Sequence, residues 1–245
     1  MNILRMGRDE LLALRPEELL WRLSKDEVMH IAKTLGAFWS YDYEALKKGK
    51  PGMHALLKSG RHSDGFFVLK ILLASENILR IFANQMVMMI RDARIPRSDY
   101  VAGVPDGATS LGRGVAKFLG AREALLKKVD GRITLETRLR AGDSILLIED
   151  FCTRGTGFAE AVASIKRKQP EAHVMPYNPV IINRGGLKTI FTEECGDCTI
   201  LPLVEWQVQD WDPTDDVCSL CQAGSVPIKP KATDANWEAL NASQR

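Results

Sequence analysis

The stretch from residue 145 to 157 constrains this chain more than any other. Four branched apolar residues, Ile145 to Ile148, predict a buried strand. Two acids, Glu149 and Asp150, follow it, and a loop rich in Thr and Gly then leads toward a helix beginning near Phe158. In an open α/β sheet, ligands bind outside the carboxyl ends of the strands. The stretch therefore predicts a ligand site at the end of this strand.

The loop itself favours a phosphorylated ligand. A helix N-terminus presents free N–H groups and the positive end of a dipole to phosphate. Gly155 and Gly157 let the backbone approach closely, and Thr153 and Thr156 add hydroxyl donors. The two acids would repel phosphate, but carboxylates accept hydrogen bonds well from a sugar diol. The alternative is an ordinary strand-to-turn connection with surface acids.

The rest of the chain alternates helical and strand patterns. Apolar stripes predict broken helices over residues 9–36, and Ser75 is placed to cap a long helix. Strands are expected near residues 100–104, 124–127 and 173–182, with a helix over 109–119 and a polar loop over 129–132. This order predicts an α/β fold with a parallel sheet. We divide the chain into a helical extension (1–50), a ligand-binding domain (51–210) and a tail (211–245). The tail is expected to have little core of its own, but it carries two residues able to dock, Trp237 and Leu240.

Composition argues against several partners. The chain has 33 Lys and Arg against 31 Asp and Glu, a net charge of +2, which gives no electrostatic reason to expect nucleic acid or membrane as a partner. No apolar stretch of signal-peptide or membrane-spanning length is present. Five cysteines are an odd number in a chain of moderate size, which disfavours a secreted disulfide scaffold. A cytoplasmic protein is expected.

The acid-and-glycine loop resembles the phosphoribosyl diphosphate signature of type I phosphoribosyltransferases. The resemblance implies the type I phosphoribosyltransferase fold, a mostly parallel sheet flanked by helices with a small hood region, and a homodimer that uses Mg²⁺ with the diphosphate. It implies that Glu149 and Asp150 hold the ribose. The residues that it implies for the phosphate cradle are Phe151, Cys152, Thr153, Arg154, Gly155, Thr156 and Gly157. Arg154 and Gly157 depart from the usual pattern.

Residues 52–67 are similar to the amino-terminal segment of one branch, the orotate phosphoribosyltransferases. The shared run is Leu57-Lys58-Ser59-Gly60-Arg61-His62-Ser63, followed by two aromatics. The resemblance implies that Phe66 and Phe67 wall the flat base and that Lys58 faces the phosphates. An aromatic face stacks on a planar ring, and a lysine is a mobile point charge for a diphosphate. The alternative for the two phenylalanines is core packing.

Three further segments resemble the same branch. Residues 101–108 look like its diphosphate loop, in which Asp106 is unusual. Residues 127–132 resemble a shorter form of its mobile catalytic loop, which implies that Lys128 stabilises the leaving diphosphate with Lys127 and Arg132 beside it; a solvated hairpin tip is the alternative. Residues 181–186 resemble the strand end at which Arg184 contacts orotate, although Asn183 stands where Asp is usual.

The implied reaction joins orotate to phosphoribosyl diphosphate and gives orotidine monophosphate and diphosphate, a step of pyrimidine nucleotide biosynthesis. Two alternatives remain open. One is a phosphoribosyltransferase for another nucleobase. The other is a non-catalytic regulator that senses phosphoribosyl diphosphate, which is disfavoured because the helices before Gly52 have no evident basic face.

Two Cys-x-x-Cys pairs suggest a structural zinc site as well. Cys195 and Cys198 form one pair and Cys218 and Cys221 the other, with a separation typical of four-cysteine zinc sites. Such a site closes a tetrahedron of thiolates and leaves no position for catalysis. The second pair also lies in residues 218–230, which resemble the C-terminal segment of one orotate phosphoribosyltransferase subgroup, so coincidence of the first pair is the alternative. Disulfides are disfavoured in a reducing cytoplasm.

Overall fold

The computed structural model describes residues 1–212 and 217–245, and these form two compact units. Unit 1 comprises Met1–Leu35 and Leu69–Gln207, and unit 2 comprises Gly36–Val68 and Val208–Arg245. The units cut across the linear segments expected from the sequence, since residues 1–35 pack with the sheet and the tail packs with residues 36–68.

Unit 1 is built on a predominantly parallel sheet. Its strands run in the order β12-β13-β11-β9-β5-β6, with β10 also paired to β9. Every neighbouring pair is parallel except β12 and β13, which are antiparallel. The strands are β5 (Tyr100–Gly103), β6 (Arg122–Glu123), β9 (Ser144–Cys152), β10 (His173–Val174), β11 (Tyr177–Asn183), β12 (Thr189–Thr192) and β13 (Gly196–Glu205). The expected parallel α/β sheet is confirmed.

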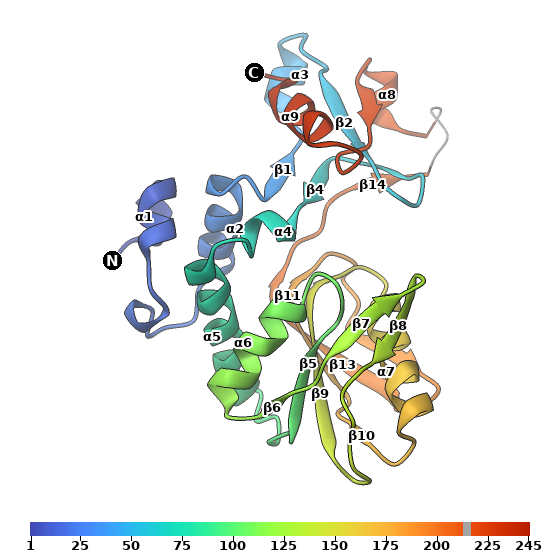
Figure 1. The fold of residues 1–245 in the computed structure, drawn as a ribbon. Coiled ribbons are helices and arrows are strands. Elements are labelled where there is room, and N and C mark those ends of the chain that lie inside the picture. Colours follow the sequence, from blue (N-terminus) through green and yellow to red (C-terminus); the bar gives the residue numbers. More distant parts are fainter. Residues whose placement is uncertain (213–216) are drawn as a thin grey trace. The chain divides into compact units, whose positions relative to one another are not determined.

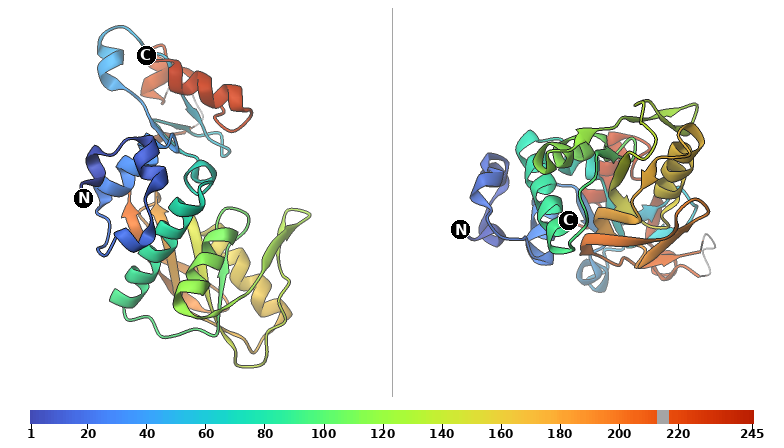
Figure 2. Two further views of the ribbon diagram at one scale, coloured as in Figure 1. Left: turned by 60° about the vertical axis from the view of Figure 1, so that its left-hand side comes forward. Right: turned by 90° about the horizontal axis from the view of Figure 1, so that it is seen from below.

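Helices cover both faces of this sheet (Figures 1 and 2). α5 (Glu76–Asp92) and α6 (Thr109–Leu119) lie on one face, and α7 (Thr156–Lys168) lies on the other. The apolar side chains of β9 point alternately to the two faces of the sheet. Ile145 and Leu147 join the buried cluster that contains Phe158 and Val162 of α7. Ser75 stands at the N-cap of α5 as expected, but its side chain makes no capping hydrogen bond.

The N-terminal residues form short helices that belong to unit 1. They are η1 (Ile3–Arg5), α1 (Arg8–Ala13), η2 (Pro16–Glu18) and α2 (Lys25–Thr34), and α4 (Leu69–Leu72) precedes α5. Ser24 and Glu27 form a capping box at the start of α2. α1 and η2 pack on α5, and α2 packs on β13. Among the described residues, no helix has the length and apolar character that crossing a bilayer requires.

Unit 2 combines two small sheets and three helices of the described chain. One sheet runs β14-β3-β2-β15, and β1 pairs with β4 in the other. The elements are β1 (Phe38–Ser40), α3 (Tyr43–Lys47), β2 (Met53–Leu56), β3 (His62–Ser63), β4 (Gly65–Phe67), β14 (Asp210–Trp211), α8 (Ser219–Gln222), β15 (Val226–Ile228) and α9 (Asp234–Ala242). Leu240 and Trp237 pack with Trp39, Tyr41 and Trp211. The two residues therefore dock, and the tail contributes more to a buried core than its composition predicts.

Candidate active site

The candidate site begins on β9, in the middle of the unit 1 sheet. β9 runs as far as Cys152, so the two acids lie on the strand itself rather than after it. Ile148 pairs with Gly103 of β5 and Glu149 with Val180 of β11. Because successive side chains point to opposite faces of a sheet, the two acids are directed to different faces. Glu149 lies on the face of the sheet that α7 covers, as Leu147 does, and Asp150 lies on the opposite face.

Glu149 is a buried carboxyl group. It is 6% exposed, and its Oε2 accepts a hydrogen bond of 2.7 Å from Nδ2 of Asn178 on β11. The backbone N–H of Phe158, in the first turn of α7, also donates to it. Burial raises the pKa of Glu149 to about 7, and the negative charge of Asp150 adds to the rise, whereas the two donors lower it. Glu149 thus changes charge near neutral pH.

Asp150 lies against the turn that follows β5. A Cβ on Gly107 would overlap the Asp150 carboxylate, so this turn needs glycine for close approach. The turn is fastened to β9 because the N–H of Val104 donates to the carbonyl of Ile148 at 2.8 Å. α6 begins directly after it, at Thr109. The turn and its helix N-terminus therefore lie next to the end of β9.

The loop after β9 has the geometry of an anion cradle. Gly155 has φ +70° and is the N-cap of α7, and a side chain there would overlap Ile190 of β12. Thr156 is the first helical residue and is exposed, as is Arg154. The first N–H groups of a helix have no intrahelical acceptor, so α7 directs donors at this loop. α6 and α7 thus present two helix N-termini at neighbouring strand ends, an arrangement suited to a ligand with two phosphate groups.

Comparisons with known proteins agree with this geometry. No family model matches the chain. It is 28% identical over 193 residues to the orotate phosphoribosyltransferase of Nitratiruptor sp., covering 76% of this chain and 92% of the relative. It is 26% identical over 198 residues to the orotate phosphoribosyltransferase of Caldicellulosiruptor bescii, covering 77% and 92%. A solved structure of orotate phosphoribosyltransferase from Aeropyrum pernix superposes with a TM-score of 0.53 and 17% identity, covering 73% of this chain and 93% of that one.

The chain has the type I phosphoribosyltransferase fold. The resemblance to orotate phosphoribosyltransferases is confirmed as well, since relatives of that name match over most of the chain. The loop after β9 and the turn after β5 are thus set in the fold that the sequence motifs predicted.

The predicted catalytic loop is a β-hairpin of this phosphoribosyltransferase fold. β7 (Leu126–Val129) and β8 (Arg132–Leu135) are antiparallel and joined by Asp130 and Gly131, which both have positive φ. The hairpin is fixed to α7, because Glu160 accepts a 2.7 Å hydrogen bond from the N–H of Ile133. Lys127, Lys128 and Arg132 are exposed near its tip. A solvated tip and a catalytic role are both compatible with this exposure.

Arg184 lies directly after β11. Its N–H donates to the carbonyl of Cys152 at 2.8 Å, which places its backbone beside the end of β9. Asn183, the departure from the usual Asp, is buried, and its Nδ2 donates to the carbonyl of Leu187 at 2.8 Å. An aspartate could not make this bond, because an ionised carboxylate only accepts. Asn183 therefore closes the turn that carries Arg184.

Lys58, Phe66 and Phe67 lie in unit 2. Lys58 is exposed in the turn between β2 and β3. Phe67 is 7% exposed and stacks on Phe38 with ring centroids 4.2 Å apart, so it is a core residue of this unit. Phe66 is half-buried, with Trp237 at 6.1 Å between ring centroids. Of the two predicted aromatics, Phe66 keeps the more accessible ring.

The two predicted cysteine pairs have different surroundings. Cys198 is buried in the core of unit 1, where Cys195 packs beside it, and burial raises the pKa of both thiols. Cys218 and Cys221 lie in unit 2 with His54 and His62. The two histidines were not expected as ligands from the sequence.

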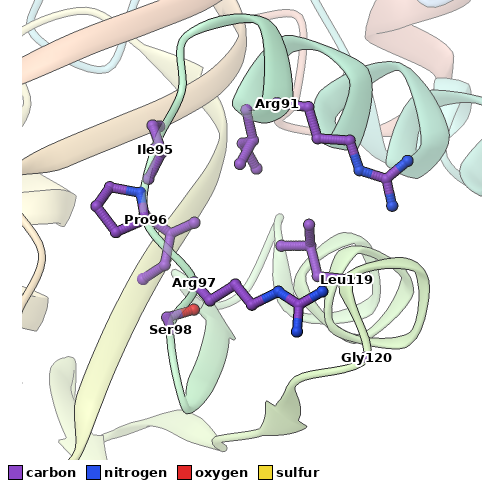
Figure 3. A pocket seen from close by; sticks show the side chains of 9 residues that line it. Arg91, Ile95, Pro96, Arg97, Ser98, Leu119 and Gly120 are labelled. Atoms are coloured by element: carbon purple, nitrogen blue, oxygen red, sulfur yellow. The ribbon is translucent and has the colours of Figure 1, made fainter.

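A pocket of about 170 Å³ lies in unit 1 away from the loops just described (Figure 3). Its lining comes from the end of α5, the link into β5 and the end of α6, including Arg91, Arg97 and Leu119. These segments surround the amino end of β5. Because ligands of such sheets bind at the carboxyl ends, the pocket is not assigned to the candidate site.

Asn178 is the residue of this site that sequence reasoning missed. It lies within β11, and its amide is the side-chain donor to Glu149. The signal in the sequence was a polar residue inside an apolar strand pattern. That signal does not identify Glu149 as the partner, because Glu149 is 29 positions away in the chain. The pairing of β11 with β9 brings the two together.

Burial of Glu149 predicts a pH-dependent effect of its replacement. Its folded pKa of about 7 exceeds the ordinary value of 4.5, so the stability associated with the protonated form is fully present below pH 4.5 and is lost as pH rises to about 7. Glu149→Gln should therefore raise the free energy of unfolding of the ligand-free protein above pH 7, by on the order of 3 kcal/mol, and have a small effect near pH 4.5. Urea unfolding across this pH range measures it. The exposed Glu193→Gln is the control, and a Glu149→Gln effect that is constant with pH would contradict the buried, pKa-shifted carboxyl.

Proposed function

We propose that this protein transfers the phosphoribosyl group of phosphoribosyl diphosphate to N1 of orotate and releases diphosphate. The proposal rests on one observation: the end of β9 that carries the two acids lies beside two helix N-termini, those of α6 and α7. Relatives named orotate phosphoribosyltransferase cover most of this chain and most of their own length, which supports orotate as the acceptor. The enzyme would be a cytoplasmic homodimer.

The donor is bound by the loop after β9. The N–H groups at the start of α7 and the hydroxyls of Thr153 and Thr156 hold the 5-phosphate, with Phe151, Cys152, Arg154 and Gly157 completing the cradle. Asp150 and Glu149 accept hydrogen bonds from the ribose hydroxyls. The raised pKa of Glu149 reduces the repulsion between this acid and the phosphates, because near pH 7 a fraction of the protein molecules has an uncharged Glu149.

The diphosphate would carry Mg²⁺. The strand ends offer oxygen ligands that suit this hard cation, the carboxylate of Asp150 and the exposed Asp106 on the neighbouring turn. When bound, Mg²⁺ neutralises negative charge on the leaving diphosphate. Asp106 is unusual beside a diphosphate, but it is compatible with the site when Mg²⁺ is bound.

The remaining predicted residues act on the base and on the leaving group. The guanidinium of Arg184 suits the carboxylate and carbonyls of orotate. Phe66 retains the base-contacting role that the resemblance implies, and Lys58 the phosphate-facing role, whereas Phe67 packs in the core of unit 2. Lys128, with Lys127 and Arg132, stabilises negative charge on the diphosphate as the bond to C1 breaks.

The acceptor is tested with a panel of bases. Purified protein, phosphoribosyl diphosphate and Mg²⁺ are incubated with orotate, uracil, adenine or hypoxanthine, and nucleotide and diphosphate are measured. Orotidine monophosphate is expected from orotate. Turnover of another base without orotate would indicate a different phosphoribosyltransferase. Donor binding with no turnover, together with salt-dependent DNA binding, would indicate the regulator.

Thr156→Val tests the phosphate cradle. The substitution keeps the side-chain shape and removes a hydroxyl that we place on the 5-phosphate, so donor binding should weaken by about 1.5–3 kcal/mol. Calorimetric titration with phosphoribosyl diphosphate measures this change. Thr199→Val, at an exposed position of β13, is the matched control. Equal donor affinity in the two folded variants would contradict the assignment.

Lys128→Ala tests the hairpin. A lysine that meets the leaving group chiefly in the transition state should affect turnover more than binding. We expect kcat to fall by far more than the donor dissociation constant rises. Lys117→Ala, at an exposed lysine near the end of α6, controls for loss of a surface charge. An unchanged kcat would transfer the role to Lys127 or Arg132, or show the hairpin to be passive.

A further inference from the structure

Four side chains of unit 2 bring potential metal ligands together. His54, His62, Cys218 and Cys221 each offer one ligand atom, and these four atoms lie within 4.8 Å of one another. His54, His62 and Cys218 are buried, and Cys221 is half-buried. The candidate active site described above uses none of the four.

Four of the six separations between these atoms are close to the edges of a tetrahedral zinc site. The two ring nitrogens, Nε2 of His54 and Nδ1 of His62, are 3.1 Å apart. Sγ of Cys218 lies 3.7 Å from Nε2 of His54, and Sγ of Cys221 lies 3.6 Å from the same atom and 3.3 Å from Nδ1 of His62. Tetrahedral zinc bonds to nitrogen and sulfur give edges of about 3.3 Å for N–N and about 3.6 Å for N–S. These four separations are within a few tenths of an ångström of those values, and all four atoms lie within 4.8 Å of one another.

The fold explains why the four residues converge. In the β2–β3 hairpin, Leu56 is opposite His62, so His54 and His62 are diagonal neighbours on one face. Cys218 is the N-cap of α8 and Cys221 lies one turn later, so both thiols face the same side of this short helix. β15 follows α8 and pairs with β2 in parallel, which fixes α8 beside the hairpin. The two pairs therefore meet although they are far apart in the sequence.

A hydrogen-bond chain orients the ring of His54. Oγ of Ser225 donates to the carbonyl of Gly52 at 3.2 Å, and it lies 2.9 Å from Nδ1 of His54. Because the one hydroxyl hydrogen is used on Gly52, Ser225 accepts from an N–H at Nδ1, and we assign the remaining lone pair of His54 to Nε2. Metal-bound histidines are typically held in this way, by a hydrogen bond from the second ring nitrogen. Nε2 is the atom that faces His62 and both thiols.

We propose that His54, His62, Cys218 and Cys221 bind one Zn²⁺ ion in a structural site. Two thiolates and two imidazoles close the tetrahedron, so no position remains for substrate. The ion would tie the β2–β3 hairpin to α8, which joins the two chain segments that make up unit 2. The buried cluster of this unit is small, and a metal is a common means of stabilising small units. This ligand set replaces Cys195 and Cys198 of the four-cysteine prediction by two histidines.

The proposal is tested on the full chain purified without added metal or chelator. Elemental analysis should find about one zinc ion per chain, as expected for one closed site. The double variant Cys218→Ser, Cys221→Ser should lose the zinc. The matched control is Cys195→Ser, Cys198→Ser, which alters the other Cys-x-x-Cys pair and should keep it. Zinc loss in both double variants would overturn the proposed ligand set in favour of the four-cysteine site.

Two further measurements keep the test decisive if the first double variant fails to fold. Wild-type protein, stripped with chelator and refilled with Co²⁺, should show the strong visible bands of tetrahedral cobalt together with thiolate charge-transfer absorption. Ser225→Ala, which removes the partner of His54 and leaves all four ligands, should weaken zinc binding by about 10–100-fold. Wild-type protein that contains no zinc and gives no tetrahedral cobalt spectrum would overturn the proposal.

Discussion

The structure depends on the position of β9 between two parallel neighbours. β5 and β11 flank it, so its apolar residues are buried on both faces, and the carboxyl ends of all three strands lie at one edge of the sheet. This position destabilises the charged form of Glu149, because burial raises its pKa to about 7. Asn178 and the N–H of Phe158 offset that cost by donating to the carboxyl group. The same edge receives the start of α6 and of α7.

Close backbone packing brings the loops of this edge together. A side chain on Gly107 would overlap Asp150, one on Gly155 would overlap Ile190, and one on Gly185 would overlap the backbone of Thr153. These contacts hold the turn after β5 and the loop after β11 against the end of β9. A binding site assembled from backbone N–H groups requires such approach, since side chains at these positions would separate the loops.

Unit 2 shows how a small unit can be assembled from distant segments. Its aromatic cluster joins Trp39 and Tyr41 to Trp211 and Trp237, and α9 closes it with Leu240. The proposed zinc site lies beside this cluster, because Cys218 belongs to it and Cys221 packs against it. Apolar surroundings exclude water from the ligands, which favours a site that binds its metal tightly and takes no part in catalysis.

Local periodicity and turn chemistry were enough to predict the strand, acids and loop of residues 145–157, the helix over 109–119 and the α/β class. The sequence also indicated the resemblance from which the ligand was inferred. The partner of Glu149, the core position of Phe67 and the grouping of Cys218 and Cys221 with His54 and His62 became visible only in the folded chain. Each of these depends on strand pairing between segments far apart in the chain, and spacing along a single sequence carries no information about which distant segments pair.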